Sequence, residues 1–356
     1  MALQSESFRG DAKLEAAAVS NPAHIRAPAT GIHVSKIQRA LLQLDGAQIE
    51  KAELSEGRYG DSTTTAVLRY KDKRTIINRS YEDAVDPIVG VMTMASLDKE
   101  LALKEKADPG FIFFTDDQRI TLKAALERGK QMVDVALKRI RGASNSIVTP
   151  RNVAYYETKL ALLNVFRTNT FRSDDLPIPQ DILDAIQRRL GRLKSQPTPA
   201  SSPVDAFNIA FLLQNFAQLR GSLDENFRKE FYTMSSFRGE DLGFLEAFVD
   251  GAKNFADPTM HIRPLFFDPT FTVDHRGATF AHERAHTVFH ASGHPGTGDN
   301  PFCVAPHLGD PNVTDSGQAL ANPYCYEWFI VAVQPNYSPA PFLQGCIVTG
   351  GSSSGP

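Results

Sequence analysis

The sequence carries little net charge and lacks long apolar runs, and each shortage excludes a class of partner. Its 38 Lys and Arg residues and 41 Asp and Glu residues leave a formal net charge of −3. The chain therefore lacks the basic field that drives binding to nucleic acids or to anionic membranes. No run of about 18 consecutive apolar residues occurs, so no transmembrane helix is expected. We predict neither a nucleic acid nor a membrane as a partner.

Cysteines are also scarce, and the two ends of the chain lack helical or strand periodicity. Cys303, Cys325 and Cys346 allow either one disulfide with a free thiol or three thiols. Residues 1–31 show no basic start followed by an apolar core, so no signal peptide is visible, and their Ala, Ser and Pro content predicts a flexible arm. Residues 341–356 are rich in Gly and Ser toward their end and are expected to form a flexible tail.

A chain of 356 residues exceeds what one ordinary hydrophobic core supports, so more than one domain is expected. The 42% of hydrophobic and 22% of charged residues are typical of a globular protein. Residues 255–273 are rich in Phe, with one Ile and one Val, and are broken by prolines, which indicates one or two short strands at a sheet edge. Elsewhere the apolar periodicity predicts helices at 32–46, 115–140, 153–167, 180–193 and 205–219. The predicted fold class is mainly α with a small β-sheet (α+β).

Residues 59–70 and 89–100 form an internal half-repeat. Each has a glycine followed by Thr three residues on, a small residue six on and an aliphatic residue seven on. With QRALLQL before them, the segments YGDSTTTAV and VGVMTMASL resemble the bacterial peptidoglycan-binding domain. The resemblance implies a three-helix domain over 32–105 with peptidoglycan as a partner, although Asp61 and Val91 stand where the family has proline. A helical spacer or docking module is the alternative.

The segment from His282 to His286 has the pattern His-Glu-x-x-His. Residues four apart lie on one face of a helix, so both imidazoles can bind one zinc ion, and Glu283 can act as the general base toward a metal-bound water. A histidine-rich helix without a metal is the alternative. A catalytic zinc site normally has three protein ligands and a water. The candidates for the third ligand are His290, His294, Asp299, His307, Asp310 and Glu327. The metzincin arrangement is excluded because Phe289 and Ser292 replace its Gly and His.

Three motifs around this segment resemble the aspzincins, the deuterolysin and lysine-specific metalloendopeptidase family. They are GTGD at 296–299, ALANPYCYEWF at 319–329 and PLFFDPTF at 264–271. The resemblance implies a zincin-like metallopeptidase domain over 110–340. It also implies that Asp299 is the third zinc ligand, beside His282 and His286.

Two departures from the family pattern affect the expected chemistry. Phe302 stands where the family has a tyrosine that stabilises the oxyanion, so another donor is required. The candidates for this donor are Tyr324, Tyr326, His290 and His294. Lysine-specific members attract the substrate with an Asp and a Glu, which are Tyr324 and Glu327 here, so strict lysine specificity is not expected. Glu327 is expected to bind a basic group of the substrate, together with His290 and His294; capping or pairing with Arg276 is its alternative role.

The sequence as a whole predicts a zinc metalloendopeptidase that its N-terminal domain targets to the bacterial cell wall. A protein or peptide is the expected substrate, and a secreted, wall-associated or periplasmic location is expected. Two alternatives remain. One is an endopeptidase or amidase acting on peptidoglycan stem peptides, and the other is an inactive wall-binding protein with a structural zinc site.

Overall fold

The computed structural model describes residues 3–80, 82–144, 150–190, 197–200, 203–234, 236–237, 240–241, 245–249, 259–289 and 313–337. It divides into two compact units. The first unit comprises Met1–Lys123, Asn226–Asp250 and Asp257–Phe271, and the second comprises Ala124–Glu225, Gly251–Ala256 and Thr272–Pro356. The described residues are mainly helical with a small four-stranded sheet, which confirms the α+β class. The predicted domain limits stay a prediction.

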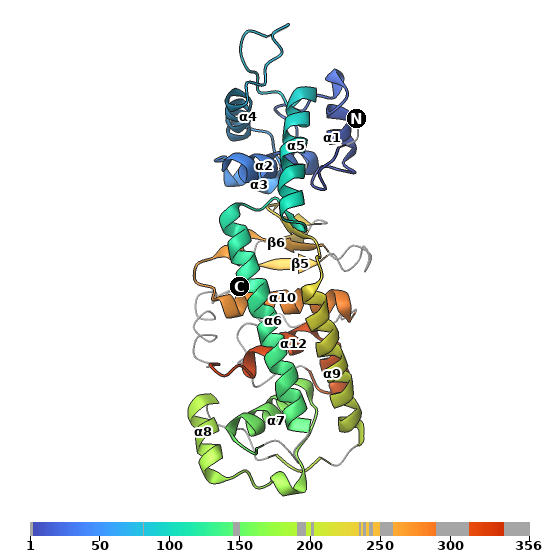
Figure 1. Cartoon of the computed structure of the whole chain (residues 1–356), viewed down its shortest axis with the longest axis vertical. Helices are drawn as coiled ribbons and strands as arrows, with labels where there is room; N and C mark the ends of the chain where they lie inside the picture. Colours follow the sequence, from blue (N-terminus) through green and yellow to red (C-terminus); the bar gives the residue numbers. More distant parts are fainter. Residues whose placement is uncertain are drawn as a thin grey trace, which may run out of the picture. The chain divides into compact units, whose positions relative to one another are not determined.

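Three longer helices and one short helix follow one another in the first unit. They are α2 (Ile32–Asp45), α3 (Lys51–Glu56), α4 (Asp61–Lys73) and α5 (Val91–Ala107), and α2 packs against both α4 and α5 (Figure 1). The two glycines of the half-repeat, Gly60 and Gly90, directly precede α4 and α5.

A carboxylate caps the first turn of α4. Glu53 of α3 accepts hydrogen bonds from the backbone N–H groups of Ser62 and Thr63 and from the Thr63 hydroxyl. Burial opposes the charge of Glu53, but these donors outweigh burial and lower its pKa to about 2. The approach is so close that a Cβ atom on Gly60 would lie 2.4 Å from Glu53 Oε1. A side chain at position 60 would therefore clash with Glu53, which explains the glycine there.

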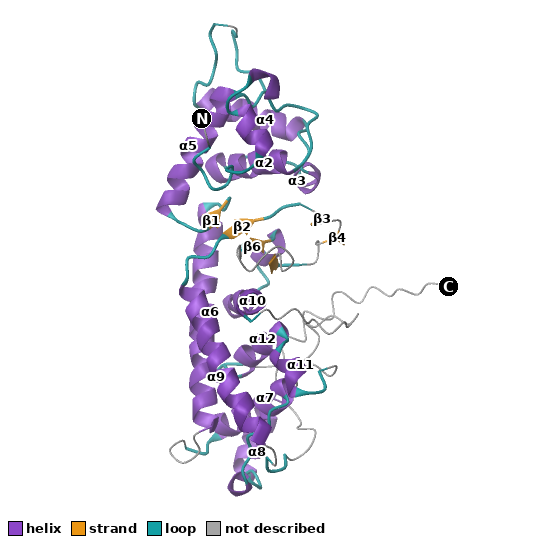
Figure 2. Cartoon of the chain, turned by 90° about the vertical axis from the view of Figure 1, so that its right-hand side faces the viewer, coloured by secondary structure: helices purple, strands orange, loops and turns teal. Residues whose placement is uncertain are grey.

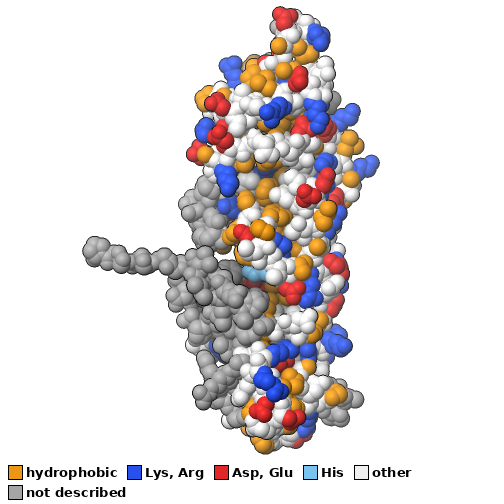
Figure 3. All heavy atoms as spheres, turned by 90° about the vertical axis from the view of Figure 1, so that its left-hand side faces the viewer, with side chains coloured by type: hydrophobic (Ala, Val, Ile, Leu, Met, Phe, Trp, Pro, Cys, Tyr) orange, Lys and Arg blue, Asp and Glu red, His pale blue; other side chains and the backbone are white. Residues whose placement is uncertain are grey.

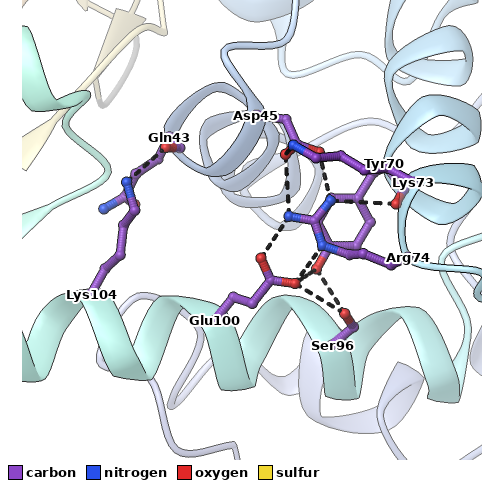
Figure 4. Close-up of polar contacts among 8 residues, drawn as sticks. All are labelled: Gln43, Asp45, Tyr70, Lys73, Arg74, Ser96, Glu100 and Lys104. Atoms are coloured by element: carbon purple, nitrogen blue, oxygen red, sulfur yellow. Dashed lines mark hydrogen bonds and ion pairs between the residues drawn. The ribbon is translucent and has the colours of Figure 1, made fainter.

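An ion-pair cluster joins the C-terminal ends of α2 and α4 to the middle of α5 (Figure 4). The Arg74 guanidinium lies 3.7 Å from the centroid of the Tyr70 ring and donates to Glu100 Oε2 at 2.6 Å and to Asp45 Oδ2 at 2.7 Å. The Tyr70 hydroxyl also donates to Glu100, at 2.9 Å. Burial opposes ionisation of Glu100, but the bonds from Arg74 and Tyr70 outweigh it and lower its pKa. The cluster holds the three helices in register.

Residues 3–31 pack onto the first unit, in contrast to the flexible arm expected from composition. They form α1 (Ala12–Ala17) and the 3-10 turn η1 (Asn21–Ala23), and Phe8 and Leu14 are fully buried. Two carboxylates of α5 hold the segment. Asp98 accepts hydrogen bonds from the backbone N–H groups of residues 4 and 5, and Glu105 accepts them from residues 6 and 7.

The sheet of the first unit has the strand order β1, β2, β6, β5; Figure 2 labels the first three of these strands and Figure 1 labels β6 and β5. Its strands are β1 (Phe111–Ile112), β2 (Lys229–Phe231), β5 (Ala247–Val249) and β6 (Met260–Ile262). The β1–β2 and β2–β6 pairs are parallel and β5–β6 is antiparallel. A separate antiparallel pair joins β3 (Ser236–Phe237) to β4 (Glu240–Asp241). Arg39 of α2 is fully buried and pairs with Glu230 of β2 at 2.5 Å, which ties the helices to the sheet.

The strand expected at a sheet edge within residues 255–273 lies inside the sheet instead. β6 has β2 on one side and β5 on the other. The segment that follows is not a strand. It forms the 3-10 turn η3 (Pro264–Phe267), because Pro264 has no N–H to donate to a ladder.

Helices make up the second unit as far as the structure describes it. They include α7 (Val153–Phe166), α8 (Gln180–Leu190), α9 (Pro203–Asp224), α10 (Val273–Val288), α11 (Ser316–Leu320) and α12 (Pro323–Ala332), with the 3-10 turn η2 (Ser173–Asp175). The long helix α6 (Asp116–Ser144) contains the division between the units. It begins at the predicted capping box, in which Thr115 and Gln118 bond each other's backbone N–H. α10 packs against α9 and α12, and α12 packs against α7 (Figure 1).

Acidic and basic side chains alternate over the face drawn in Figure 3. Among the described residues drawn there, neither sign gathers into one continuous field, in keeping with the small net charge. Among the described helices, none combines the length and the apolarity that crossing a bilayer requires.

Candidate metal centre

The histidine-bearing helix α10 is held by α6 through a close backbone contact. A Cβ atom on Gly277 of α10 would lie 2.8 Å from the Gly129 nitrogen of α6, and one on Gly129 would lie 2.7 Å from the Gly277 oxygen. Near the start of α10, Asp274 pairs with Arg128 at 2.7 Å. The Thr272 hydroxyl caps the helix by accepting from the backbone N–H of His275 at 3.1 Å. These contacts fix the position of α10 along α6.

The two histidines of the motif converge as their spacing predicts. His282 Nε2 and His286 Nε2 lie 3.2 Å apart. Two nitrogen ligands of a tetrahedral zinc ion, each ~2.05 Å from the metal, are separated by ~3.3 Å. His282 is 7% exposed and His286 is half-buried. The pair, called the histidine pair below, therefore fits two corners of one zinc tetrahedron.

A carboxylate from α12 contacts the far side of one imidazole. Glu327 Oε2 lies 2.8 Å from His282 Nδ1. An ionised carboxylate only accepts, so this contact favours a proton on Nδ1, and in the neutral ring Nε2 then keeps its lone pair. The Asn322 side chain caps α12 by accepting from the Tyr324 N–H at 3.0 Å. The structure thus pairs Glu327 with His282 instead of with Arg276.

Glu283, the expected general base, follows His282 on α10 and is 7% exposed. A carboxylate in the second position of a His-Glu-x-x-His motif is suited to exchange a proton with a metal-bound water. Its catalytic role stays a prediction.

The two tyrosines expected to donate to the oxyanion occupy different environments. The Tyr324 ring lies beside the histidine pair, with its centroid 4.4 Å from that of His282. Tyr326 is fully buried among the rings of Phe166, Phe216 and Phe289. Its hydroxyl donates to the Leu320 carbonyl at 3.0 Å and accepts from Asn215 Nδ2 at 2.6 Å.

Both partners of the Tyr326 hydroxyl lie in the core, which argues against its predicted donation to the oxyanion. Burial also raises its pKa, which keeps the hydroxyl protonated. Tyr324 is left as the tyrosine adjacent to the histidine pair in the described part of the chain.

Several of the predicted site residues lie outside the described residues. They are Asp299, His290, His294, Phe302, His307 and Asp310, together with Cys303 and Cys346. Cys325 is buried. Within the described ranges no group of three or more His, Cys, Asp or Glu side chains is placed to hold a metal. Asp299 as the third ligand therefore stays a prediction that rests on the sequence.

Sequence analysis missed three contacts that support this centre. Gly129 and Gly277 stand in helix interiors, a pattern that can indicate close backbone packing. Arg284 on α10 donates to Glu225 at 3.0 Å, and no spacing rule predicts a pair of residues so far apart in the chain. The same holds for the bond between Glu327 and His282, since one lies on α12 and the other on α10.

Comparison of the chain with models of protein families, with curated proteins and with solved structures yields no match.

Proposed function

We propose that the second unit is a zinc-dependent peptidase and that His282 and His286 bind its metal. The observation that carries the proposal is the pair of Nε2 atoms 3.2 Å apart, with a carboxylate on Nδ1 of the more buried ring. Histidines that bind zinc almost always donate their other ring N–H to a carboxylate, a carbonyl or a water. The motif and the geometry thus support the same chemistry. Asp299 is proposed to complete the ligand set.

The zinc ion, when bound, polarises the scissile carbonyl and lowers the pKa of a coordinated water toward ~7. Glu283 accepts a proton from the attacking water and delivers it to the leaving amine, which explains a carboxylate directly beside a ligand histidine. Tyr324, whose ring contacts His282, is proposed to donate its hydroxyl to the oxyanion in place of the tyrosine that Phe302 replaces.

The first unit is proposed to bind peptidoglycan, as its half-repeat and its helices α2, α4 and α5 support. Binding to the cell wall would raise the local concentration of wall-borne substrates. Proteins and peptides in the wall are the proposed substrates, and peptidoglycan stem peptides are the alternative. A secreted or wall-associated location forms part of the proposal.

A purely structural zinc site is the second candidate, and burial favours it. His282 and Glu283 are each 7% exposed, and a closed site without access for substrate would show such burial. In that case the protein would bind the wall without cleaving it.

The decisive experiment compares the full chain with Glu283→Gln, His286→Ala and the control Glu225→Gln. Zinc content is measured by atomic emission, and hydrolysis of casein and of purified wall fragments is followed by mass spectrometry with and without a chelator. We expect Glu283→Gln to keep zinc and lose hydrolysis, and His286→Ala to lose both. Glu225→Gln breaks a carboxylate contact to α10 away from the histidine pair and should keep both. Zinc-loaded wild type that cleaves neither substrate would rule out the peptidase.

A further inference from the structure

Glu327 contacts the histidine pair from the side opposite the metal-binding atoms. Its Oε2 atom lies 2.8 Å from His282 Nδ1, while His282 Nε2 faces His286 Nε2. A carboxylate that bonds Nδ1 cannot also bind an ion held at Nε2, because the two nitrogens lie on opposite edges of the ring. Glu327 is therefore not one of the metal ligands.

The surroundings of Glu327 fix the carboxylate in this orientation. Its side chain is 11% exposed, and that of His282 is 8% exposed. Both belong to packed helices, since α10 and α12 are in direct contact. Water competes weakly for a bond at such low exposure, and a charged acceptor makes the bond stronger than a neutral one. The ring of His282 is thereby held in one rotamer and one tautomer.

We infer that Glu327 is a positioning residue for the metal centre, which orients His282 and keeps its proton on Nδ1. The inference rests on the proposed function, and it replaces the role in substrate binding expected from the sequence. A neutral histidine ring in water prefers its proton on Nε2. Without Glu327, His282 would shift toward that form, in which the proton on Nε2 blocks metal binding. Loss of an outer carboxylate of this kind typically lowers metal affinity by about 10–100-fold.

The test uses the full chain with Glu327→Ala, Glu327→Gln and the control Glu225→Gln. Zinc affinity is measured by competition with a chromophoric chelator. We expect Glu327→Ala to bind zinc about 100-fold more weakly and Glu327→Gln about 10-fold more weakly, because the amide keeps an acceptor but loses the charge. Glu225→Gln, which removes a different carboxylate contact to α10, should bind zinc as the wild type does.

A second readout does not depend on the metal. Nitrogen NMR of histidine-labelled protein, stripped of zinc and assigned with His282→Ala, reports which nitrogen of His282 carries the proton. We expect the Nδ1–H form in the wild type and a shift toward the Nε2–H form in Glu327→Ala. An Nε2–H form in the wild type overturns the inference, as does a zinc affinity of Glu327→Ala within twofold of the wild type. If the wild type shows the Nδ1–H form but binds no zinc, the proposed function fails instead, and the positioning of His282 by Glu327 stands as a contact without a metal.

Discussion

Gly277 of α10 and Gly129 of α6 meet backbone to backbone, with no room for a side chain on either residue. A methyl group at Gly277 would lie 2.8 Å from the Gly129 nitrogen and 3.2 Å from the Ala125 oxygen. These obstacles are backbone atoms of a packed helix, so neither can rotate away. The helix that carries the histidine pair can therefore pack this closely on α6 only because both residues are glycine.

Gly277→Ala should therefore destabilise the second unit. Alanine gains about 1 kcal/mol of helix propensity over glycine, but forced contact in a packed interior costs about 1–3 kcal/mol, and more when backbone must move. We expect a net loss of up to about 2 kcal/mol in the free energy of unfolding, measured by urea titration. The matched control is Gly221→Ala on α9, where a Cβ atom meets nothing within 4 Å and a small gain is expected. Equal effects of the two substitutions would contradict the close contact.

Arg74→Lys should weaken the bundle of the first unit although the charge is kept. Lysine lacks the planar fork of donors with which the guanidinium bonds Glu100 and Asp45 while it lies against the Tyr70 ring. We expect a loss of about 1–2 kcal/mol in the free energy of unfolding. Arg58→Lys is the control, because the Arg58–Glu56 pair is exposed and almost no change in stability is expected. A loss at Arg58 as large as at Arg74 would rule out a special role for the cluster.

Glu53 should make the first unit sensitive to acid. Its pKa is lowered from 4.5 to about 2 in the folded chain, so its stabilising effect is fully present above pH 4.5 and is lost as the pH falls toward 2. Glu53→Gln should cost about 1–3 kcal/mol near neutral pH, and its stability should fall less steeply over that interval. Thr63→Val removes one of the donors to Glu53 and should give an intermediate slope. Parallel curves for wild type and Glu53→Gln, from thermal melts between pH 5 and pH 2.5 or thereabouts, would exclude this cap as the cause.

Removing the hydroxyl of Tyr326 should lower stability, whereas removing that of Tyr324 should lower the rate of hydrolysis. Tyr326→Phe leaves Asn215 and the Leu320 carbonyl without their buried partner, so the free energy of unfolding should fall by about 1–3 kcal/mol with little change in kcat. Tyr324→Phe should lower kcat by about 10²–10³-fold if its hydroxyl stabilises the oxyanion. Steady-state kinetics and urea titration of both variants check the pair of effects. A normal kcat in Tyr324→Phe would show that another group donates to the oxyanion.

The sequence predicted those parts of the fold that rest on local chemistry. Helices α6 and α7 begin within a residue or two of their predicted starts, because a capping box and a run of periodic apolar residues are local signals. The convergence of His282 and His286 also follows from a spacing of four on one helix. The strands were harder to predict, since each has only two or three residues and too few positions for an alternating pattern.

Contacts between segments far apart in the chain could not be predicted from local sequence patterns. Tyr324 and Tyr326 are two residues apart on one helix, within the ALANPYCYEWF motif. Tyr326 is nevertheless buried in the core, while Tyr324 lies beside His282. Their roles separate only when the partners on α7 and α9, such as Phe166 and Phe216, are known. The packing of the N-terminal residues was not predicted for the same reason. The carboxylates that hold them lie more than 90 positions away in the chain.

Those carboxylates, Asp98 and Glu105, have a practical consequence for protein engineering. A shortened chain starting near residue 32, the choice that composition alone would suggest, would lose Phe8 and Leu14 from the core and leave two buried acids without their backbone donors. Newly exposed apolar surface and uncompensated charge both favour aggregation. Expression trials that retain the first 31 residues should therefore give more soluble material than trials that remove them.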